Sequence, residues 1–307
     1  MTLMAGASEI VDIAELDCVY LSYDEPQKEE FWAKISAMVP WAKRVDGVKG
    51  SDAAHKAAAA ASDTDRFILI DGDNLPYGPF FNLQLVLDDS NRHAVFRWKA
   101  MNIINGLAYG NGGISCWTKK FVSEMRTHEN TDGSDATQVE FCWNDGYWAM
   151  HDIYSTTFPN QSPYQAWRAG FREGVKMCLD RGVKPSLMEF QDRVSKGNMR
   201  NLSIWHNIGS DIENGLWAML GARMGTHMTM LDGWDHRKVH DFDEIRGVFD
   251  AEFADLEFDS DDLDHYGHEL YSKLGMKIVP DDPQFSDFFK SYAVTRANRG
   301  IMVREGG

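Results

Sequence analysis

The sequence predicts an α/β protein with a mostly parallel sheet flanked by helices, followed by a helical C-terminal appendage. Two observations lead to this prediction. Short apolar runs alternate with segments of helical spacing through the first third of the chain, which is typical of a parallel sheet covered by helices. The chain also has 307 residues, of which 43% are hydrophobic, so it can bury a large core. We expect a main domain over residues 1–235 and an acidic helical appendage over residues 236–307 that packs on it.

The first third contains three predicted strands separated by two predicted helices. The strands are short apolar runs over residues 17–22, 42–48 and 66–70. The first helix, over residues 27–38, opens at Pro26 and has three apolar residues spaced to face a core, namely Phe31, Ile35 and Met38. The second helix is alanine-rich, and Ser51 is its expected N-cap.

The later elements are predicted mainly from helical spacing. One strand is expected over residues 95–101, and helices are expected over residues 118–126, 162–179 and 211–224. The second of these helices turns its apolar residues inward, namely Tyr164, Trp167, Phe171 and Val175. The final segment from Pro283 is also helical in pattern.

Charge and cysteine content limit the classes of protein that fit. The net charge is −16, but residues 241–264 alone carry eleven carboxylates against one arginine, so a local basic face elsewhere is still allowed. No run approaches the roughly 18 apolar residues of a membrane span, and the first residues are acidic, unlike a secretory signal. The four cysteines are scattered and are expected to be reduced thiols. We therefore expect a cytoplasmic protein with no membrane partner.

An acidic motif follows the third apolar run. Asp71 and Asp73 flank Gly72 directly after the predicted strand over residues 66–70. Ligand sites in open α/β sheets lie beyond the carboxyl ends of strands. Mg²⁺ and Mn²⁺ take oxygen ligands and are commonly shared between one or two carboxylates and substrate phosphates. The strands and helices before the motif favour such a metal site over a solvated Asp-Gly turn.

Five stretches of the sequence together resemble glycosyltransferases encoded by tailed bacteriophages. They are LDCVYLSYDEP, AKRVDGVKGSDAAHKAA, RFILIDGDN, GNGGISCW and SPYQAWRAGFREGVK, within residues 15–235. The Asp-Gly-Asp motif matches the DxD element of the GT-A fold. The resemblance implies a GT-A-like domain, a Mn²⁺ or Mg²⁺ cofactor and a nucleotide-diphosphate sugar as co-substrate, with a UDP-sugar favoured. The expected location is then the cytoplasm of an infected bacterial host.

The resemblance implies donor-binding roles for residues near the motif. Asp71 and Asp73 would hold the ion that bridges the donor diphosphate, and the turn Tyr23-Asp24-Glu25, through Tyr23 and Asp24 above all, would receive the base and ribose. Lys49 and Lys56 border the same region. Each could offset the charge of the diphosphate or could simply be a solvated surface lysine.

A glycine-rich loop and one carboxylate complete the implied site. Gly112 and Gly113 would bring the backbone against the donor sugar, although the same residues also suit an ordinary hairpin turn. Asp145 is the expected general base of an inverting reaction, with Asp152 as the alternative. A retaining reaction would need neither carboxylate, and the sequence does not choose between the two outcomes.

Further metal and phosphate ligands are expected in the second half of the chain. His206 and Asp211 are candidates for additional metal ligands, although a histidine beside a tryptophan is more often a core residue. Arg168 and Arg172 lie four residues apart and could clamp a phosphate or pair with an acid such as Glu173.

Candidate acceptors follow from the resemblance and from the local charge of residues 181–200. The resemblance suggests 5-hydroxymethylpyrimidine in double-stranded DNA, and a local excess of +3 over residues 181–200 includes Arg193 and Lys196 as candidate DNA contacts. A glycan, lipid or protein acceptor is the alternative. A nucleotidyltransferase is less favoured, because the turn after the first strand is acidic and lacks glycine. A non-enzymatic module is disfavoured by the intact acidic motif.

Overall fold

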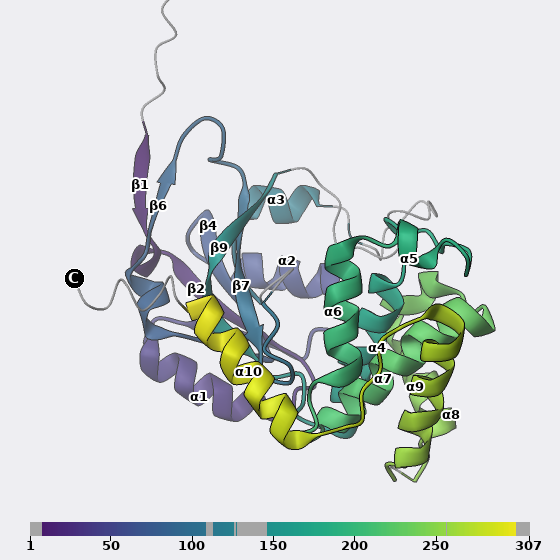
Figure 1. Cartoon of the computed structure of the whole chain (residues 1–307). Coiled ribbons are helices and arrows are strands. Elements are labelled where there is room, and N and C mark those ends of the chain that lie inside the picture. The colour runs from purple at the N-terminus through teal and green to yellow at the C-terminus, as the bar shows by residue number, and fades with distance from the viewer. Residues whose placement is uncertain (1–7, 109–112, 126, 128–145, 256, 299–307) are drawn as a thin grey trace, which may run out of the picture.

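The computed structural model describes residues 8–108, 113–125, 127, 146–255 and 257–298, and it divides into a sheet half and a helical half (Figure 1). The chain is an α/β protein whose main sheet has the strand order β3-β2-β4-β8-β7-β9-β5. These strands are β2 (Asp17–Ser22), β3 (Lys43–Asp46), β4 (Arg66–Asp71), β5 (Asn74–Pro76), β7 (Val95–Asn102), β8 (Ile114–Thr118) and β9 (Tyr147–Thr157). A separate antiparallel pair joins β1 (Glu9–Asp12) to β6 (Gln84–Leu87).

The main sheet is mixed, so the expectation of a mostly parallel sheet is wrong. β2 pairs in parallel with β3 and β4, and β7 pairs in parallel with β9. The other three pairs, β4–β8, β7–β8 and β5–β9, are antiparallel. The cause lies in the connections, because the short segment between β7 and β8 leaves no room for the crossover helix that a parallel pair requires.

Ten helices occur in the described part of the chain. They are α1 (Lys28–Met38), α2 (Ser51–Ala61), α3 (Lys119–Glu124), α4 (Pro163–Met177), α5 (Phe190–Arg193), α6 (Lys196–Asn207), α7 (Gly215–His227), α8 (Phe242–Glu252), α9 (Ser260–Leu274) and α10 (Pro283–Asn298). None of the described helices is both long and apolar enough to span a membrane.

β4 is buried on both faces, as the continuous apolar run predicts. Its alternate residues point to opposite sides of the sheet. Ile68 and Ile70 join the core beneath α1, whereas Phe67 and Leu69 join the core beneath α2 and α3. This double burial holds the end of β4, where the acidic motif begins, between two packed layers.

The helical half forms one continuous core. A Cβ atom on Gly170 of α4 would lie 1.9 Å from the backbone oxygen of Ala218 in α7, so only glycine permits this close helix contact. The ring of Phe249 in α8 lies 5.2 Å from that of Trp167 in α4. The core therefore continues past residue 235 into the acidic segment, and α10 then runs back toward the sheet half (Figure 1).

Several element boundaries differ from the predictions. Met38 is 38% exposed, because α1 ends there and Phe31 and Ile35 already fill the core contact. Ser51 is the first residue of α2 rather than its cap, since Gly50 occupies the cap position with φ of 93°. The helix expected over residues 211–224 is shifted to Gly215–His227. The sequence patterns missed five strands and one long helix, namely β1, β5, β6, β8, β9 and α6.

Candidate functional site

The acidic motif lies at the carboxyl end of β4 and its backbone is held from three directions. The Tyr20 hydroxyl donates to the Gly72 carbonyl at 2.7 Å. The Asp71 amide donates to the Gly113 carbonyl at 2.9 Å, and the Asp73 carbonyl accepts from the Phe158 amide at 2.8 Å. The motif is therefore a fixed part of the sheet edge rather than a solvated turn.

The two motif carboxylates have different surroundings. Asp73 accepts hydrogen bonds from the Asn74 side chain and from the Thr157 hydroxyl, each at 2.9 Å. No described residue donates a hydrogen bond to the Asp71 carboxylate. Burial, together with the charges of Asp73 and Glu25, raises the pKa of Asp71 to about 8. Among the described residues, Asp71 thus has no compensating cation.

Glu25 is a third acidic residue at the motif, and the sequence patterns assigned it no role of its own. A Cβ atom on Gly72 would lie 2.5 Å from the Glu25 carboxyl carbon, so the glycine makes room for this carboxylate. Burial is the largest cause that raises the pKa of Glu25, and the charge of Asp73 adds to it. The acidic turn after the first strand was the only available signal.

One glycine of the glycine-rich loop, Gly113, contacts the acidic motif. Gly113 has φ of +75°, and a Cβ atom there would lie 2.0 Å from the side-chain nitrogen of Asn74. Both its conformation and its contact therefore exclude other residues. Gly112 lies outside the described residues, as does Asp145, the expected base. Asp152, the alternative base, is an exposed residue of β9.

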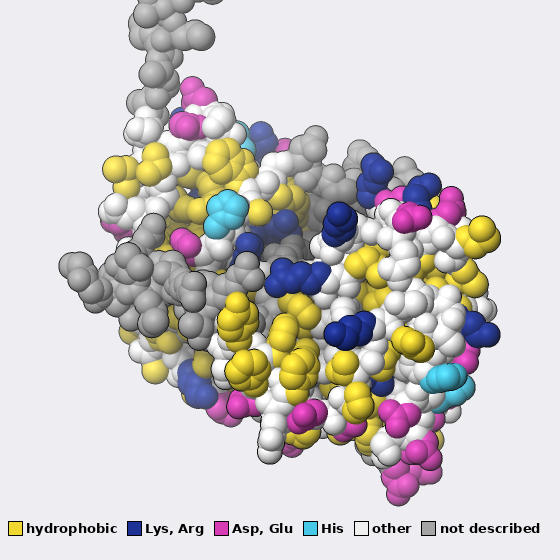
Figure 2. Space-filling model, viewed as in Figure 1, with side chains coloured by type: hydrophobic (Ala, Val, Ile, Leu, Met, Phe, Trp, Pro, Cys, Tyr) yellow, Lys and Arg dark blue, Asp and Glu magenta, His cyan; other side chains and the backbone are white. Residues whose placement is uncertain are grey.

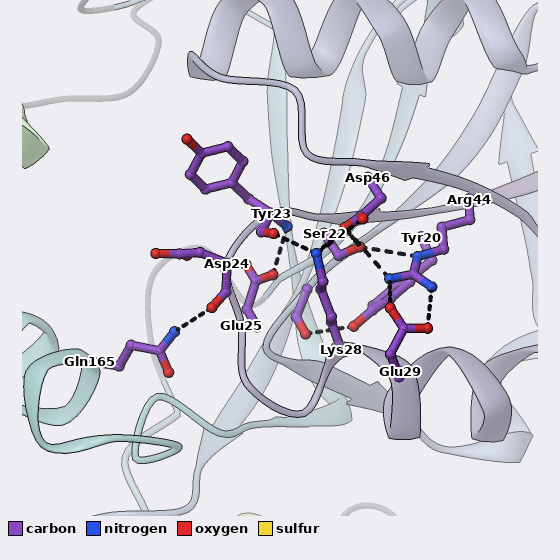
Figure 3. Close-up of polar contacts among 11 residues, drawn as sticks. Tyr20, Ser22, Tyr23, Asp24, Glu25, Lys28, Glu29, Arg44, Asp46 and Gln165 are labelled. Atoms are coloured by element: carbon purple, nitrogen blue, oxygen red, sulfur yellow. Dashed lines mark hydrogen bonds and ion pairs between the residues drawn. The ribbon is translucent and has the colours of Figure 1, made fainter.

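A polar network holds the turn that follows β2 (Figure 3). The Lys28 ammonium donates to the Tyr23 carbonyl at 2.7 Å and pairs with Asp46 at 2.8 Å. The Tyr23 amide donates to Glu25 at 2.7 Å. Figure 3 shows the Tyr23 ring pointing away from these contacts, and the side chain is 45% exposed. Asp24 is also exposed, and its carbonyl accepts from Gln165 of α4 at 3.5 Å.

The two candidate lysines lie beside the same sheet edge but are paired with acids. Lys49 precedes α2 and lies 3.4 Å from Asp243 of α8, with 77% of its side chain exposed. Lys56 pairs with Asp52 one turn earlier in α2 at 2.6 Å. Both pairs are exposed enough to exchange partners at little cost.

The two candidates for additional metal ligands, His206 and Asp211, have other partners in the structure. His206 is fully buried between α6 and α7, and its Nε2 atom lies 3.0 Å from the Thr226 hydroxyl. Burial, with the nearby charge of Arg223, lowers the pKa of His206 to about 3. Asp211 forms an ion pair with Lys290 of α10 at 2.5 Å. Across the described residues, no three His, Cys, Asp or Glu side chains are grouped so as to hold a metal ion. His206 and Asp211 are corrected to structural positions, because closed packing and ion pairing already occupy them.

Two candidate DNA contacts lie in the helical half. Arg193 of α5 pairs with Asp180 at 2.8 Å, while Lys196 is exposed in the first turn of α6. Figure 2 shows Lys and Arg side chains over α6, whereas Asp and Glu side chains gather toward the far ends of α8 and α9. On the face shown, several cationic side chains therefore lie over α6.

Arg168 and Arg172 form no ion pair with Glu173 or with another acid among the described residues. Both guanidinium groups stack on the ring of Phe242 in α8, with Cζ-to-centroid distances of 5.1 and 4.9 Å.

Comparisons of the chain with protein families, with curated proteins and with solved structures found no match.

Proposed function

We propose that the protein is a metal-dependent glycosyltransferase that moves a sugar from a nucleotide-diphosphate sugar to an acceptor hydroxyl. The observation that carries this proposal is the Asp71 carboxylate, buried beside two further acids and without a hydrogen-bond donor from the described residues. A divalent cation would relieve that repulsion. Two carboxylates with remaining positions for substrate oxygens suit Mg²⁺ or Mn²⁺.

Each residue near the motif has a role in this proposal. Asp71 and Asp73 would hold the cation, and Asn74 and Thr157 orient the Asp73 carboxylate. The cation would neutralise charge on the departing diphosphate. The exposed Tyr23 ring would stack on the nucleotide base, and the Gly113 backbone would lie against the donor sugar.

The transfer itself is a substitution at the anomeric carbon of the donor sugar. The acceptor oxygen forms a bond to this carbon while the bond to the diphosphate oxygen breaks. The hydroxyl proton passes to a protein base in an inverting reaction, for which Asp145 is the expected residue, or to the departing diphosphate in a retaining one.

The favoured acceptor is a 5-hydroxymethylpyrimidine in DNA. The support is the exposed cationic surface around Lys196 and Arg193, which would contact phosphates although the chain is acidic overall. Transfer to such DNA should weaken steeply with salt, and reversing both residues to Glu should raise the apparent acceptor constant without changing donor hydrolysis. Transfer only to a glycan, lipid or protein would exclude the DNA acceptor and leave the transferase.

The proposal as a whole is tested by nucleotide-sugar hydrolysis with purified protein. Activity should require Mn²⁺ or Mg²⁺, should disappear in EDTA, and should be lost in Asp71→Asn and Asp73→Asn. Asp65→Asn is the matched control, because Asp65 is an exposed carboxylate immediately before β4, at the opposite end of the same strand. Hydrolysis that persists in EDTA, or in both motif variants, would exclude the mechanism. Release of pyrophosphate from nucleoside triphosphates would instead favour a nucleotidyltransferase.

A further inference from the structure

Three arginines gather around two aromatic rings where α4 meets α8. Arg168 and Arg172 lie on the ring of Phe242, and Arg168 also lies 5.4 Å from the centroid of Tyr164. The guanidinium of Arg246 lies 4.6 Å from the same Tyr164 ring. Stacking of this kind holds guanidinium planes in place while leaving their N–H edges available for other partners.

The acids nearest to Arg168 and Arg172 contact other groups, and one of them pairs with Arg246 of the cluster itself. Asp243 contacts Lys49 at 3.4 Å, Glu244 pairs with Lys238 at 2.9 Å, and Asp250 pairs with Arg246 at 2.8 Å. Asp241 accepts from two backbone amides at the start of α8. Glu173 lies 3.7 Å from Lys176.

Arg168 and Arg172 therefore retain an excess of positive charge. In the part of the chain that the structure describes, neither one is within ion-pair distance of a carboxylate. Burial lowers the pKa of Arg172 and the adjacent charge of Arg168 lowers it further, while the charge of Glu173 offsets only part of this shift. Two neighbouring guanidinium groups without a carboxylate are costly for a purely structural contact, and an anionic ligand would offset that cost.

The cluster borders the same edge of the sheet as the acidic motif. Gln161, next to α4, accepts from the Gln27 amide at 2.8 Å, and Gln165 contacts the Asp24 carbonyl. On the other side, Lys49 bridges the loop before α2 to the first turn of α8. The turn after β2, the loop after β3 and the arginine-bearing helices are thus linked by direct contacts beyond the carboxyl ends of the parallel strands β2 and β3, the end of a sheet at which α/β proteins bind nucleotides.

We propose that Arg168, Arg172 and Arg246 form a phosphate-binding site that takes the diphosphate group of a nucleotide. This inference rests on the proposed function, since it assigns the phosphate contacts of the same donor. Guanidinium groups bind phosphate oxygens through paired N–H donors, and two of them one helical turn apart suit two linked phosphoryl groups. The site supplies positive charge from the protein, independently of the cation at Asp71 and Asp73.

The first test uses the wild-type protein and needs no variant to fold. Arginine modification by phenylglyoxal is followed by peptide mass spectrometry in EDTA, with inorganic pyrophosphate, UDP or uridine present. We expect pyrophosphate and UDP to slow modification of Arg168 and Arg172, and uridine to have no effect. Arg181, which is 93% exposed, is the internal control and should react at an unchanged rate. Equal reaction rates of Arg168 and Arg172 with and without pyrophosphate would overturn the site.

The second test measures UDP affinity of variants in EDTA by calorimetry. Arg168→Lys keeps the charge but loses the paired donors, and Arg246→Gln alters an arginine that is 54% exposed. Each should weaken UDP binding by about tenfold, the effect of losing one charge-assisted contact. Arg181→Gln is the matched control and should bind UDP as the wild type does.

The outcomes separate this site from the proposed transferase. Wild-type UDP affinity in all the arginine variants, with turnover still dependent on Asp71 and Mn²⁺, would overturn the arginine site and leave the transferase standing. Protection of these arginines by hydroxymethylated DNA but by neither UDP nor pyrophosphate would also overturn it, in favour of a contact to the nucleic-acid backbone. Protection by pyrophosphate in a protein that hydrolyses no nucleotide sugar would support the phosphate site while removing the transferase.

Discussion

Asp71 and His206 are titratable residues that the sequence proposed as metal ligands, and the structure gives them different surroundings. Burial favours the neutral form of each side chain: it raises the pKa of Asp71 to about 8 and lowers the pKa of His206 to about 3. Asp71 remains partly exposed at the end of β4 and faces two other acids. His206 has no exposed surface and lies in the interface between α6 and α7. Burial alone therefore does not mark a site, whereas access to solvent and uncompensated neighbouring charge do.

The largest effect that we expect from a change at either residue is the loss of nucleotide-sugar turnover in an Asp71 variant. Asp71→Asn should reduce nucleotide-sugar turnover by about 10³-fold or more, because it removes a ligand of the cation that stabilises the leaving diphosphate. The fold should survive, since the change is nearly isosteric and removes a repulsive charge. Steady-state hydrolysis with excess Mn²⁺ measures the loss, and circular dichroism checks the fold. Activity within a few-fold of the wild type would leave Asp71 without a catalytic role.

His206→Asn should behave in the opposite way. It leaves space between α6 and α7 and disrupts the contact with the Thr226 hydroxyl, so we expect a loss of about 2–4 kcal/mol in the free energy of unfolding. Turnover per folded molecule and its Mn²⁺ dependence should not change. Urea denaturation and a Mn²⁺ titration of activity measure the two effects. A raised Mn²⁺ requirement in a stable variant would restore His206 as a ligand.

The pH dependence of stability should also have opposite signs at the two residues. The pKa of Asp71 rises from 3.8 to about 8 on folding, so the native state binds the extra proton and stability falls as pH rises between these values. The pKa of His206 falls from 6.5 to about 3, so stability falls as pH drops through that window.

Replacing Asp71 or His206 with Asn removes the pH dependence of stability that each residue contributes. In EDTA, Asp71→Asn should stabilise the protein more at pH 8 than at pH 5, by a difference on the order of 2 kcal/mol after allowance for solvent screening. Conversely, His206→Asn should be less damaging at pH 5 than at pH 8. Urea denaturation at the two pH values measures both changes, and parallel behaviour of the variants would contradict the comparison.

The smallest expected effect is at the loop that contacts the motif. Gly113→Ala should cost about 1–2 kcal/mol, because alanine is strained at this positive φ and its Cβ atom displaces the Asn74 side chain. Since Asn74 also donates to Asp73, Mn²⁺ affinity in the activity assay should weaken modestly. Gly233→Ala is the matched control, with φ of +74° but nothing within 4 Å of the added atom. Equal effects of the two changes on Mn²⁺ affinity would show that the Asn74 contact is unimportant.

Local sequence patterns correctly predicted the elements whose buried residues form a continuous run or recur with helical periodicity. The apolar run before Asp71 became β4, and the spacing of Trp167, Phe171 and Val175 became the inner face of α4. These predictions hold because a strand buried on both faces and an amphipathic helix each leave a signature within a few residues. The resemblance led us to expect Gly113 against the donor sugar, which stays a prediction, and its hydrogen bond to the Asp71 amide was not expected.

Tertiary structure alone decided which chemically similar residues meet. β5 and β8 are too short to signal themselves, yet they set the mixed sheet, and β8 brings Gly113 to Asp71. Glu25 became part of the acidic site because its turn folds over Gly72, whereas the spacing of Arg168 and Arg172 was local and only their contact with Phe242 of α8 came from packing. Contacts between residues distant in the chain depend on how whole elements pack, and no local spacing encodes that packing. The same packing closes His206 off from solvent and leaves Asp71 at an open edge.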